Sequence, residues 1–326
     1  MQEVNKCILC DSANLSSNTA RVAPFIAERI WNKKSFKIKL AYCKDCGFSF
    51  YNPRLEECEI QALYENYRDE NYQKQRYKHE PYYTKEINEH IGKNQAEILN
   101  RKKNLYYLLD DYTELSSIRS VLDFGGDRGQ FIIDELNHAK KYVFDISGVD
   151  AVENVEKIND LAECKRHKYD LIMCCHVLEH VAFPLELIEK LKNLASENTV
   201  IYIETPFETP FLYNNVFSKL LSRISFLRAL IFNIPEAFKK RNMILKAKND
   251  SQNTLLIKEK ALLAYKYYKK ILSLREFIMH EHINFYTPQS LEKMFVNHGF
   301  HNLKVEVREI NFGWTSDKVI SCLATK

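Results

Sequence analysis

Long apolar runs are absent from this chain of 326 residues, although apolar residues make up 45% of it. No run reaches the length that a bilayer span requires, and residues 1–6 are polar. We therefore expect a soluble, cytoplasmic protein without a transmembrane segment or a secretion signal. Internal repeats and low-complexity tracts are missing as well, and the length suits one α/β core with additions.

Glycine is scarce, with eight residues in the chain, yet three of them fall between positions 125 and 129. They follow residues 121–124, an apolar stretch around Asp123 that predicts a short buried strand. After them, apolar residues recur at helical spacing: Phe131, Ile132, Ile133 and Leu136. A strand, a glycine turn and a helix are typical of a nucleotide-binding α/β unit, in which a ligand lies against the main chain. A turn without a ligand is the alternative.

The spacing of this turn differs from the dinucleotide pattern Gly-x-Gly-x-x-Gly, which disfavours a nicotinamide oxidoreductase. A second apolar strand, 141–145, ends at Asp145. An acid at this position can accept hydrogen bonds from both hydroxyl groups of a ribose. The alternative is a helix N-cap, since Asp145 and Ser147 are both good capping residues.

Further apolar strands alternate with amphipathic stretches. Residues 169–175 form an apolar run, and 199–206 form a strand that is stopped by proline. Between them, residues 185–194 place their apolar side chains on one helical face. This alternation indicates parallel βαβ units and an α/β fold.

The pattern is completed by two more helices and two closing strands. Apolar residues at spacings of three, four and seven predict one helix over 85–112. Another helix follows Thr287, its expected N-cap, with Pro288 at the first helical position. Residues 304–310 and 318–325 then predict an antiparallel pair at the end of the sheet.

The segment after 169–175 carries the most specific motif. It reads His-Val-Leu-Glu-His-Val from His176 to Val181. Together with the Asp-x-Gly-Gly-Asp-x-Gly turn, it resembles class I S-adenosylmethionine (SAM) methyltransferases. The likeness is to the sugar (C- or O-) methyltransferase-like group that carries an N-terminal zinc-binding segment. The turn departs from the family pattern at Asp127, which stands where the family usually has glycine.

The likeness covers residues 7–66, 118–210, 280–300 and 305–324, whereas 211–275 match nothing that we can identify. It implies a seven-stranded Rossmann-like methyltransferase sheet and SAM as the cofactor. It also implies cofactor-binding residues around the turn, the second strand and the loop after 169–175: Asp123, Phe124, Gly125, Gly126, Gly129, Asp145, Ile146 and His176.

Two Cys-x-x-Cys pairs lie near the N-terminus, Cys7 with Cys10 and Cys43 with Cys46. Two such pairs can complete a tetrahedral zinc shell of four thiolates. Disulfides are less expected in a reducing compartment, although chance pairs or a redox pair are alternatives. Because four sulfurs leave no open position, we expect a structural Zn²⁺ that holds a small domain together.

Charge is unevenly distributed, although the formal net charge is only +4. Residues 211–275 contain fourteen Lys or Arg residues against three acidic ones. Their pattern is helical and amphipathic, which predicts a helical lid insertion. The lid is solvated, forms a wall for an anionic substrate such as a nucleotide-linked sugar, or makes a peripheral contact with anionic lipid. Nucleic acid is not an expected partner, because the aromatic residues show no stacking platform.

These features predict three parts: a zinc-binding N-terminal domain (1–66), a helical linker (67–117) and a methyltransferase core (118–326) that contains the basic insertion. Tyrosines are frequent between residues 64 and 83. They either line a sugar site, because an aromatic face packs on a sugar while the hydroxyl hydrogen-bonds, or pack between domains.

Methyl transfer to a hydroxyl or a carbon acid requires a base, and histidine suits this role near neutral pH. By resemblance, His176 lies beside the methionine part of SAM. We expect His180 to be the base, with His282 as the next choice, and Glu179 to orient a histidine or cap a helix. The sequence thus predicts a SAM-dependent methyltransferase acting on a small-molecule or glycan acceptor. The alternative is a non-catalytic, zinc-containing module that binds a glycan or a partner on the same fold.

Overall fold

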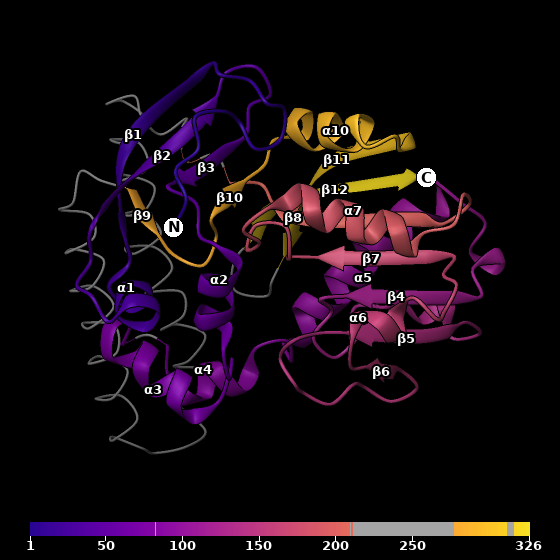
Figure 1. The fold of residues 1–326 in the computed structure, drawn as a ribbon. Coiled ribbons are helices and arrows are strands. Elements are labelled where there is room, and N and C mark those ends of the chain that lie inside the picture. The colour runs from indigo at the N-terminus through magenta and orange to yellow at the C-terminus, as the bar shows by residue number, and fades with distance from the viewer. Residues whose placement is uncertain (82, 209, 211–276, 312–315) are drawn as a thin grey trace, which may run out of the picture.

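The computed structural model describes residues 1–81, 83–208, 210, 277–311 and 316–326. Two β-sheets lie side by side, each with its own helices (Figure 1). The predicted basic lid, 211–275, lies outside the described residues. Within the described ranges, no helix is long and apolar enough to cross a bilayer.

Seven strands form the larger sheet, which confirms the predicted α/β, Rossmann-like architecture. Five of them run parallel, and the two at one edge are the predicted antiparallel pair. In spatial order they are β11 (His301–Asn311), β12 (Ser316–Thr325), β8 (Val200–Pro206), β7 (Leu171–Cys175), β4 (Ser120–Phe124), β5 (Lys140–Phe144) and β6 (Glu156–Ile158). Because parallel strands end at the same edge, the loops after β4, β5 and β7 meet there.

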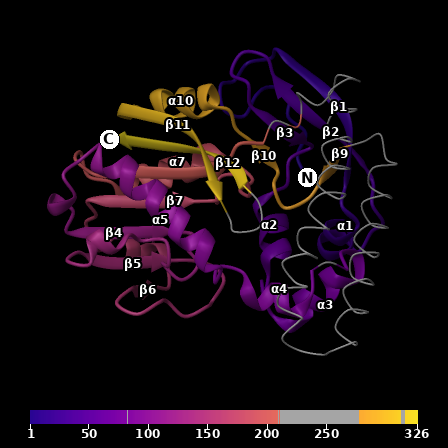
Figure 2. The same ribbon diagram turned by 180° about the vertical axis from the view of Figure 1, so that it is seen from behind.

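Helices cover both faces of this sheet. α7 (Pro184–Leu194) and α10 (Pro288–Asn297) pack on one face, where Leu187 of α7 is buried. α5 (Gln95–Asp110) crosses the opposite face, as Figure 2 shows, and buries Leu108 there. The amphipathic stretch predicted over 185–194 is therefore confirmed as a helix.

The helix predicted directly after the glycine turn is wrong. Residues 125–139 form turns and one 3₁₀ turn, η2 (Asp134–Leu136). Phe131, Ile132 and Ile133 are all buried in the core beneath α5. Three consecutive residues span about 200° of an α-helix, so one helical face could not bury all of them.

The single helix predicted within 85–112 is also wrong, because two helices occupy this segment. α4 (Lys85–His90) ends before Ile91, and α5 begins after Asn94. The side chain of Asn94 accepts a hydrogen bond from the backbone N–H of Ala96, which caps α5. The apolar periodicity runs through both helices and does not reveal the cap between them.

The smaller sheet takes strands from two distant parts of the chain. In spatial order they are β10 (Asn284–Phe285), β3 (Ser49–Asn52), β2 (Lys37–Cys43), β1 (Leu15–Val22) and β9 (Phe277–Met279). The sequence did not predict that residues 277–285 return to the N-terminal sheet. The remaining helices of the described ranges are α1 (Pro24–Trp31), α2 (Glu57–Tyr64), α3 (Glu70–His79), α6 (Leu161–Cys164) and the 3₁₀ turn η1 (Leu115–Ser117).

The cysteine loops share one hydrophobic core with the larger sheet. The ring of Phe48 lies 5.0 Å from that of Tyr286, just before α10. Thr287 caps α10 through its side chain, and Pro288 occupies the first helical position, as predicted. The hydroxyl of Thr287 also donates a hydrogen bond to the backbone carbonyl of Cys46. The second cysteine loop therefore abuts the start of α10.

Candidate active site

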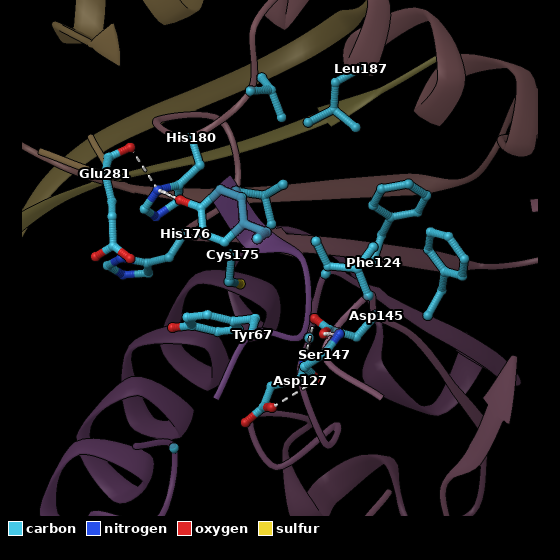
Figure 3. Close-up of a pocket in the computed structure, with 18 of the residues that line it drawn as sticks. Tyr67, Phe124, Asp127, Asp145, Ser147, Cys175, His176, His180, Leu187 and Glu281 are labelled. Atoms are coloured by element: carbon cyan, nitrogen blue, oxygen red, sulfur yellow. Dashed lines mark hydrogen bonds between the residues drawn. The ribbon is translucent and has the colours of Figure 1, made fainter. Parts of the chain in front are cut away.

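A cavity of about 550 Å³ opens where β4, β5 and β7 end. This volume falls within the roughly 300–1,000 Å³ that is typical of small-molecule sites. Its opposite wall comes from α2 and the segment that follows, including Tyr64 and Tyr67. Figure 3 shows Asp145 toward one end and His176 and His180 toward the other. The two ends differ chemically, since one offers backbone and a carboxylate and the other imidazoles.

Asp123 lies beneath the glycine turn and does not line this cavity. Its side chain is fully buried, and neither carboxylate oxygen has a hydrogen-bond partner among the described residues. Burial raises the pKa of Asp123 to about 7. A methyl group on Gly126 would lie 2.0 Å from the carboxylate carbon of Asp123, so glycine is required there by the protein's own packing. Phe124, Gly125 and Gly126 line the cavity, whereas Gly129 does not.

Asp145 follows β5 and lines the cavity. Its carboxylate accepts hydrogen bonds from the backbone N–H groups of Asp127 (2.8 Å) and Ser147 (2.7 Å). No helix begins within residues 145–155, so Asp145 is not a helix N-cap. The adjacent Ile146 side chain also lines the cavity and is 73% exposed.

Asp127, the residue that departs from the family pattern, links the turn to the opposite wall. It adopts a φ of +57°, in the left-handed region that favours glycine. Its carboxylate lies 3.1 Å from the guanidinium of Arg68, which comes from the segment after α2. The ion pair thus bridges the cavity beside Asp145.

The three predicted catalytic residues meet beside the other end of the cavity, which His180 lines and Glu179 and His282 do not. One donor atom from each of Glu179, His180 and His282 lies within 4.8 Å of the others, and we call these residues the His–Glu cluster. Nδ1 of His180 lies 2.9 Å from the hydroxyl of Tyr64 and 3.0 Å from the backbone carbonyl of Glu281. The rings of His180 and His282 are 4.9 Å apart. Residues from three distant segments therefore form one site.

His176 lies beside the cluster and lines the cavity. Its two ring nitrogens are each 3.3 Å from a buried carboxylate, Nδ1 from Glu179 and Nε2 from Glu204. Burial and the charge of Arg101 lower the pKa of His176, but these carboxylates outweigh both and leave it raised. His176 thus sits between two negative charges.

The members of the His–Glu cluster have different protonation tendencies. Burial lowers the pKa of His180, which favours the neutral ring. Burial would also lower the pKa of His282, but a hydrogen bond with Glu208 outweighs it and raises the pKa to about 9. Burial would raise the pKa of Glu179, but its contact with His176 holds it at about 2. Glu179 is therefore a buried carboxylate that stays charged.

Several cavity residues were missed by the sequence analysis. Arg101 of α5 pairs with Glu204 at the end of β8, with a nitrogen–oxygen distance of 2.7 Å. Glu281 supplies the carbonyl that contacts His180, and its carboxylate pairs with Arg76 at 2.9 Å. Buried charged residues at strand ends are a signal that could have singled out Glu204. The other residues depend on contacts between distant segments, which no local pattern reveals.

The four predicted metal ligands also converge. The sulfur atoms of Cys7 and Cys46 are 3.6 Å apart, as are those of Cys10 and Cys43. All four lie within 4.8 Å of one another, and none of the nine cysteines forms a disulfide. Four thiolates around one zinc ion, each about 2.3 Å from it, lie about 3.8 Å apart in a tetrahedron. The cluster is therefore compatible with zinc.

Residues 72–305 match the family model described as a methyltransferase domain, which is more than half of the chain. The chain belongs to this family. The match confirms the predicted enzyme class, a methyltransferase, and it extends from α3 into β11. No curated protein matches the sequence.

The solved structures that resemble this chain have low sequence identity to it. Human N-acetylserotonin methyltransferase in complex with SAM is 13% identical, with a TM-score of 0.39, over 82% of this chain and 58% of the human one. The plantazolicin methyltransferase BpumL with S-adenosylhomocysteine is 14% identical, with a TM-score of 0.39, over 82% and 93%. Magnesium protoporphyrin IX methyltransferase from Synechocystis PCC 6803 is 15% identical, with a TM-score of 0.38, over 70% and 83%.

Proposed function

We propose that this protein transfers a methyl group from SAM to a sugar or glycan-related acceptor. The observation that carries the proposal is a single cavity that is lined by the glycine turn and Asp145 at one end and by His180 of the His–Glu cluster at the other. A donor bound at the first end presents its methyl group toward the second. The two ends then hold the donor and the group that activates the acceptor within one cavity, which brings the reacting groups together.

Asp145 and Ile146 are the proposed contacts for the adenosine part of SAM. The oxygens of Asp145 already accept backbone hydrogen bonds, but each carboxylate oxygen has further lone-pair capacity for a ribose hydroxyl. The exposed Ile146 offers an apolar surface beside them, which suits a purine ring. Phe124, Gly125 and Gly126 supply the adjoining surface.

The His–Glu cluster is the proposed place of acceptor activation. The acceptor oxygen or carbon bonds to the methyl carbon as the sulfur–carbon bond breaks, and the bonding electron pair stays on sulfur. S-adenosylhomocysteine then leaves as a neutral thioether. The acceptor must also lose its proton, and His180 is the predicted base that accepts it.

The acceptor class rests on the resemblance and on the wall opposite the turn. Tyr64 and Tyr67 line the cavity with their rings perpendicular to each other, at 5.6 Å between centroids. Tyrosine offers a flat face to sugar C–H groups and a hydroxyl to sugar oxygens. A structural Zn²⁺ in the four-cysteine cluster would hold the loop that abuts the start of α10. An anionic acceptor, a cytoplasmic location and a lid role for 211–275 remain predictions.

Calorimetric titration of the full chain with SAM tests the proposal. We expect SAM to bind and Asp145→Ala to weaken binding by tenfold or more, because the carboxylate that holds the ribose and orders the turn is lost. Asp150→Ala is the matched control, since it removes an acid from the same loop outside this cavity. Methyl transfer from labelled SAM to a panel of free and nucleotide-linked sugars then tests the acceptor.

The outcomes separate the alternatives. Binding of SAM that is insensitive to Asp145→Ala would refute the proposed cofactor contact. Absence of SAM binding would favour the non-catalytic module. Transfer to none of the sugars, but to small hydroxylated molecules of another class, would refute the acceptor assignment alone.

A further inference from the structure

The two oxygens of the buried Glu179 carboxylate have different partners. The residue is 1% exposed, and Oε1 lies 3.3 Å from Nδ1 of His176, without the geometry of a hydrogen bond. The other oxygen accepts a hydrogen bond from Thr205. A buried carboxylate oxygen with this one long contact retains lone pairs for a further ligand. Nε2 of His180 lies 3.9 Å from the same oxygen.

Both histidines of the cluster have a polar partner at Nδ1, as metal-binding histidines usually have at the nitrogen that does not bind the metal. Nδ1 of His180 faces the backbone carbonyl of Glu281, and Nδ1 of His282 lies 2.9 Å from the carboxylate of Glu208. A histidine that binds a metal through one nitrogen usually donates the other N–H to a carbonyl or a carboxylate. This arrangement leaves Nε2 of each ring available.

The surrounding charge favours a cation. Two carboxylates adjoin the histidines: Glu179 lies 3.9 Å from Nε2 of His180, and Glu208 lies 2.9 Å from Nδ1 of His282. The nearby Glu204 is already paired with Arg101. A divalent ion between the histidines would be attracted by the first two carboxylates.

We propose that Glu179, His180 and His282 bind a divalent cation beside the end of the cavity that His180 lines, distinct from the four-cysteine site. Two imidazoles and one carboxylate suit Mn²⁺, Fe²⁺ or Zn²⁺ better than Mg²⁺ or Ca²⁺. Ligand atoms at about 2.1 Å from a common ion lie about 3 Å apart at right angles. The observed spread of up to 4.8 Å therefore needs the side chains to close by 1–2 Å, a scale that rotation of the half-buried histidine rings provides.

The cation would make the site prefer acceptors whose oxygens can bind it. This consequence rests on the proposed function. Three protein ligands leave open positions on the ion, which acceptor oxygens can fill. A sugar with two adjacent hydroxyls can fill two of them and is thereby oriented. The bound hydroxyl becomes more acidic and releases its proton to water, while His180 acts as a ligand.

Titration of the full, zinc-loaded chain with MnCl₂ tests the proposal. Electron paramagnetic resonance measures the concentration of free Mn²⁺ at each step, from which the bound amount follows. We expect one Mn²⁺ per chain. His282→Asn and Glu179→Gln should each weaken binding at least tenfold, while the zinc content measured in parallel stays unchanged. His280→Asn is the matched control, because His280 lies two positions away and faces Glu80 instead; it should bind Mn²⁺ as the natural chain does.

Absence of Mn²⁺ binding, or binding that both cluster variants retain, would overturn the proposal. Circular dichroism of each variant distinguishes loss of the site from loss of the fold. SAM titration of the same samples keeps the two proposals apart: SAM binding without Mn²⁺ binding refutes only the cation site. Mn²⁺ binding without SAM binding refutes only the proposed function.

Discussion

At the scale of single residues, Gly126 and Asp123 show how the glycine turn is built. A glycine turn is commonly explained by the ligand that must approach it. Here the first constraint is internal, because the carboxylate of Asp123 fills the space where a Cβ on Gly126 would lie. The buried acid and the missing side chain are thus one packing unit beneath the cavity.

Gly126→Ala should therefore disturb the turn, because the added methyl group clashes with the buried carboxylate of Asp123. We expect the free energy of unfolding to fall by about 1–3 kcal/mol, as for an overpacked core, and SAM affinity to drop at least tenfold. Chemical denaturation and calorimetry measure the two effects. The comparison is Gly148→Ala, where φ is +73° but no atom lies within 4 Å of the added methyl group.

For Gly148→Ala we expect a loss of about 1–2 kcal/mol from the left-handed backbone alone, with SAM affinity unchanged. Equal SAM affinities for the two variants would show that the clash with Asp123 does not shape the binding surface.

At the scale of elements, a single buried arginine connects the loops that carry the histidines. Arg54, just after β3, is 1% exposed. Its guanidinium donates to the backbone carbonyls of Ile283, Val181 and Ala182. Burial lowers the pKa of Arg54 to about 10, and within the described residues it forms no ion pair. The guanidinium of Arg54 therefore holds two segments to the smaller sheet through their backbone carbonyls. One segment follows β7, and the other precedes β10.

Arg54→Met should release both loops. We expect the free energy of unfolding to fall by about 2–4 kcal/mol, because buried carbonyls lose charged donors. The rate of methyl transfer should fall more than SAM affinity, since Asp145 lies at the other end of the cavity. Denaturation and steady-state kinetics measure these effects.

The control for this variant is Arg308→Met on β11, where the side chain is 34% exposed and pairs with Glu306. Loss of an exposed ion pair should change stability by no more than about 1 kcal/mol. If Arg54→Met is equally mild, the loops are held by other contacts.

At the scale of the whole molecule, the cysteine cluster is part of the main core rather than an appendage. Cys43 and Cys46 belong to the same hydrophobic cluster as Ile172 of β7 and Leu291 of α10. The smaller sheet also receives β9 and β10, which follow β8 of the larger sheet in the sequence. Removal of a metal from the cysteines should therefore weaken the molecule as a unit.

Zinc chelation, or Cys43→Ser, should lower the Tm of the whole chain by roughly 5–10 °C in one transition, which corresponds to a few kcal/mol for a protein of this size. Differential scanning calorimetry with metal analysis measures this. Cys58→Ser is the control, because Cys58 is exposed and outside the cluster. A separate low-temperature transition, with the main one unmoved, would show instead that the zinc region unfolds independently.

Local signals in the sequence were sufficient for much of this description. Apolar strands such as 121–124 and 169–175, the cap at Thr287 and the paired cysteines each depend on neighbouring residues only. The structure places these elements as predicted. Errors arose where local periodicity was ambiguous, as after the glycine turn, where buried residues follow one another without a helix.

The sequence by itself determined most strands of the larger sheet, the family motifs and the pairing of the cysteines, because each is written within a few consecutive positions. Only the tertiary structure decided that Tyr64, His180 and His282 share one site and that residues 277–285 join the first sheet. Those contacts come from strand pairing and core packing between segments more than a hundred residues apart. Such pairings are set by the energy of the whole fold and leave no local pattern from which they could be read.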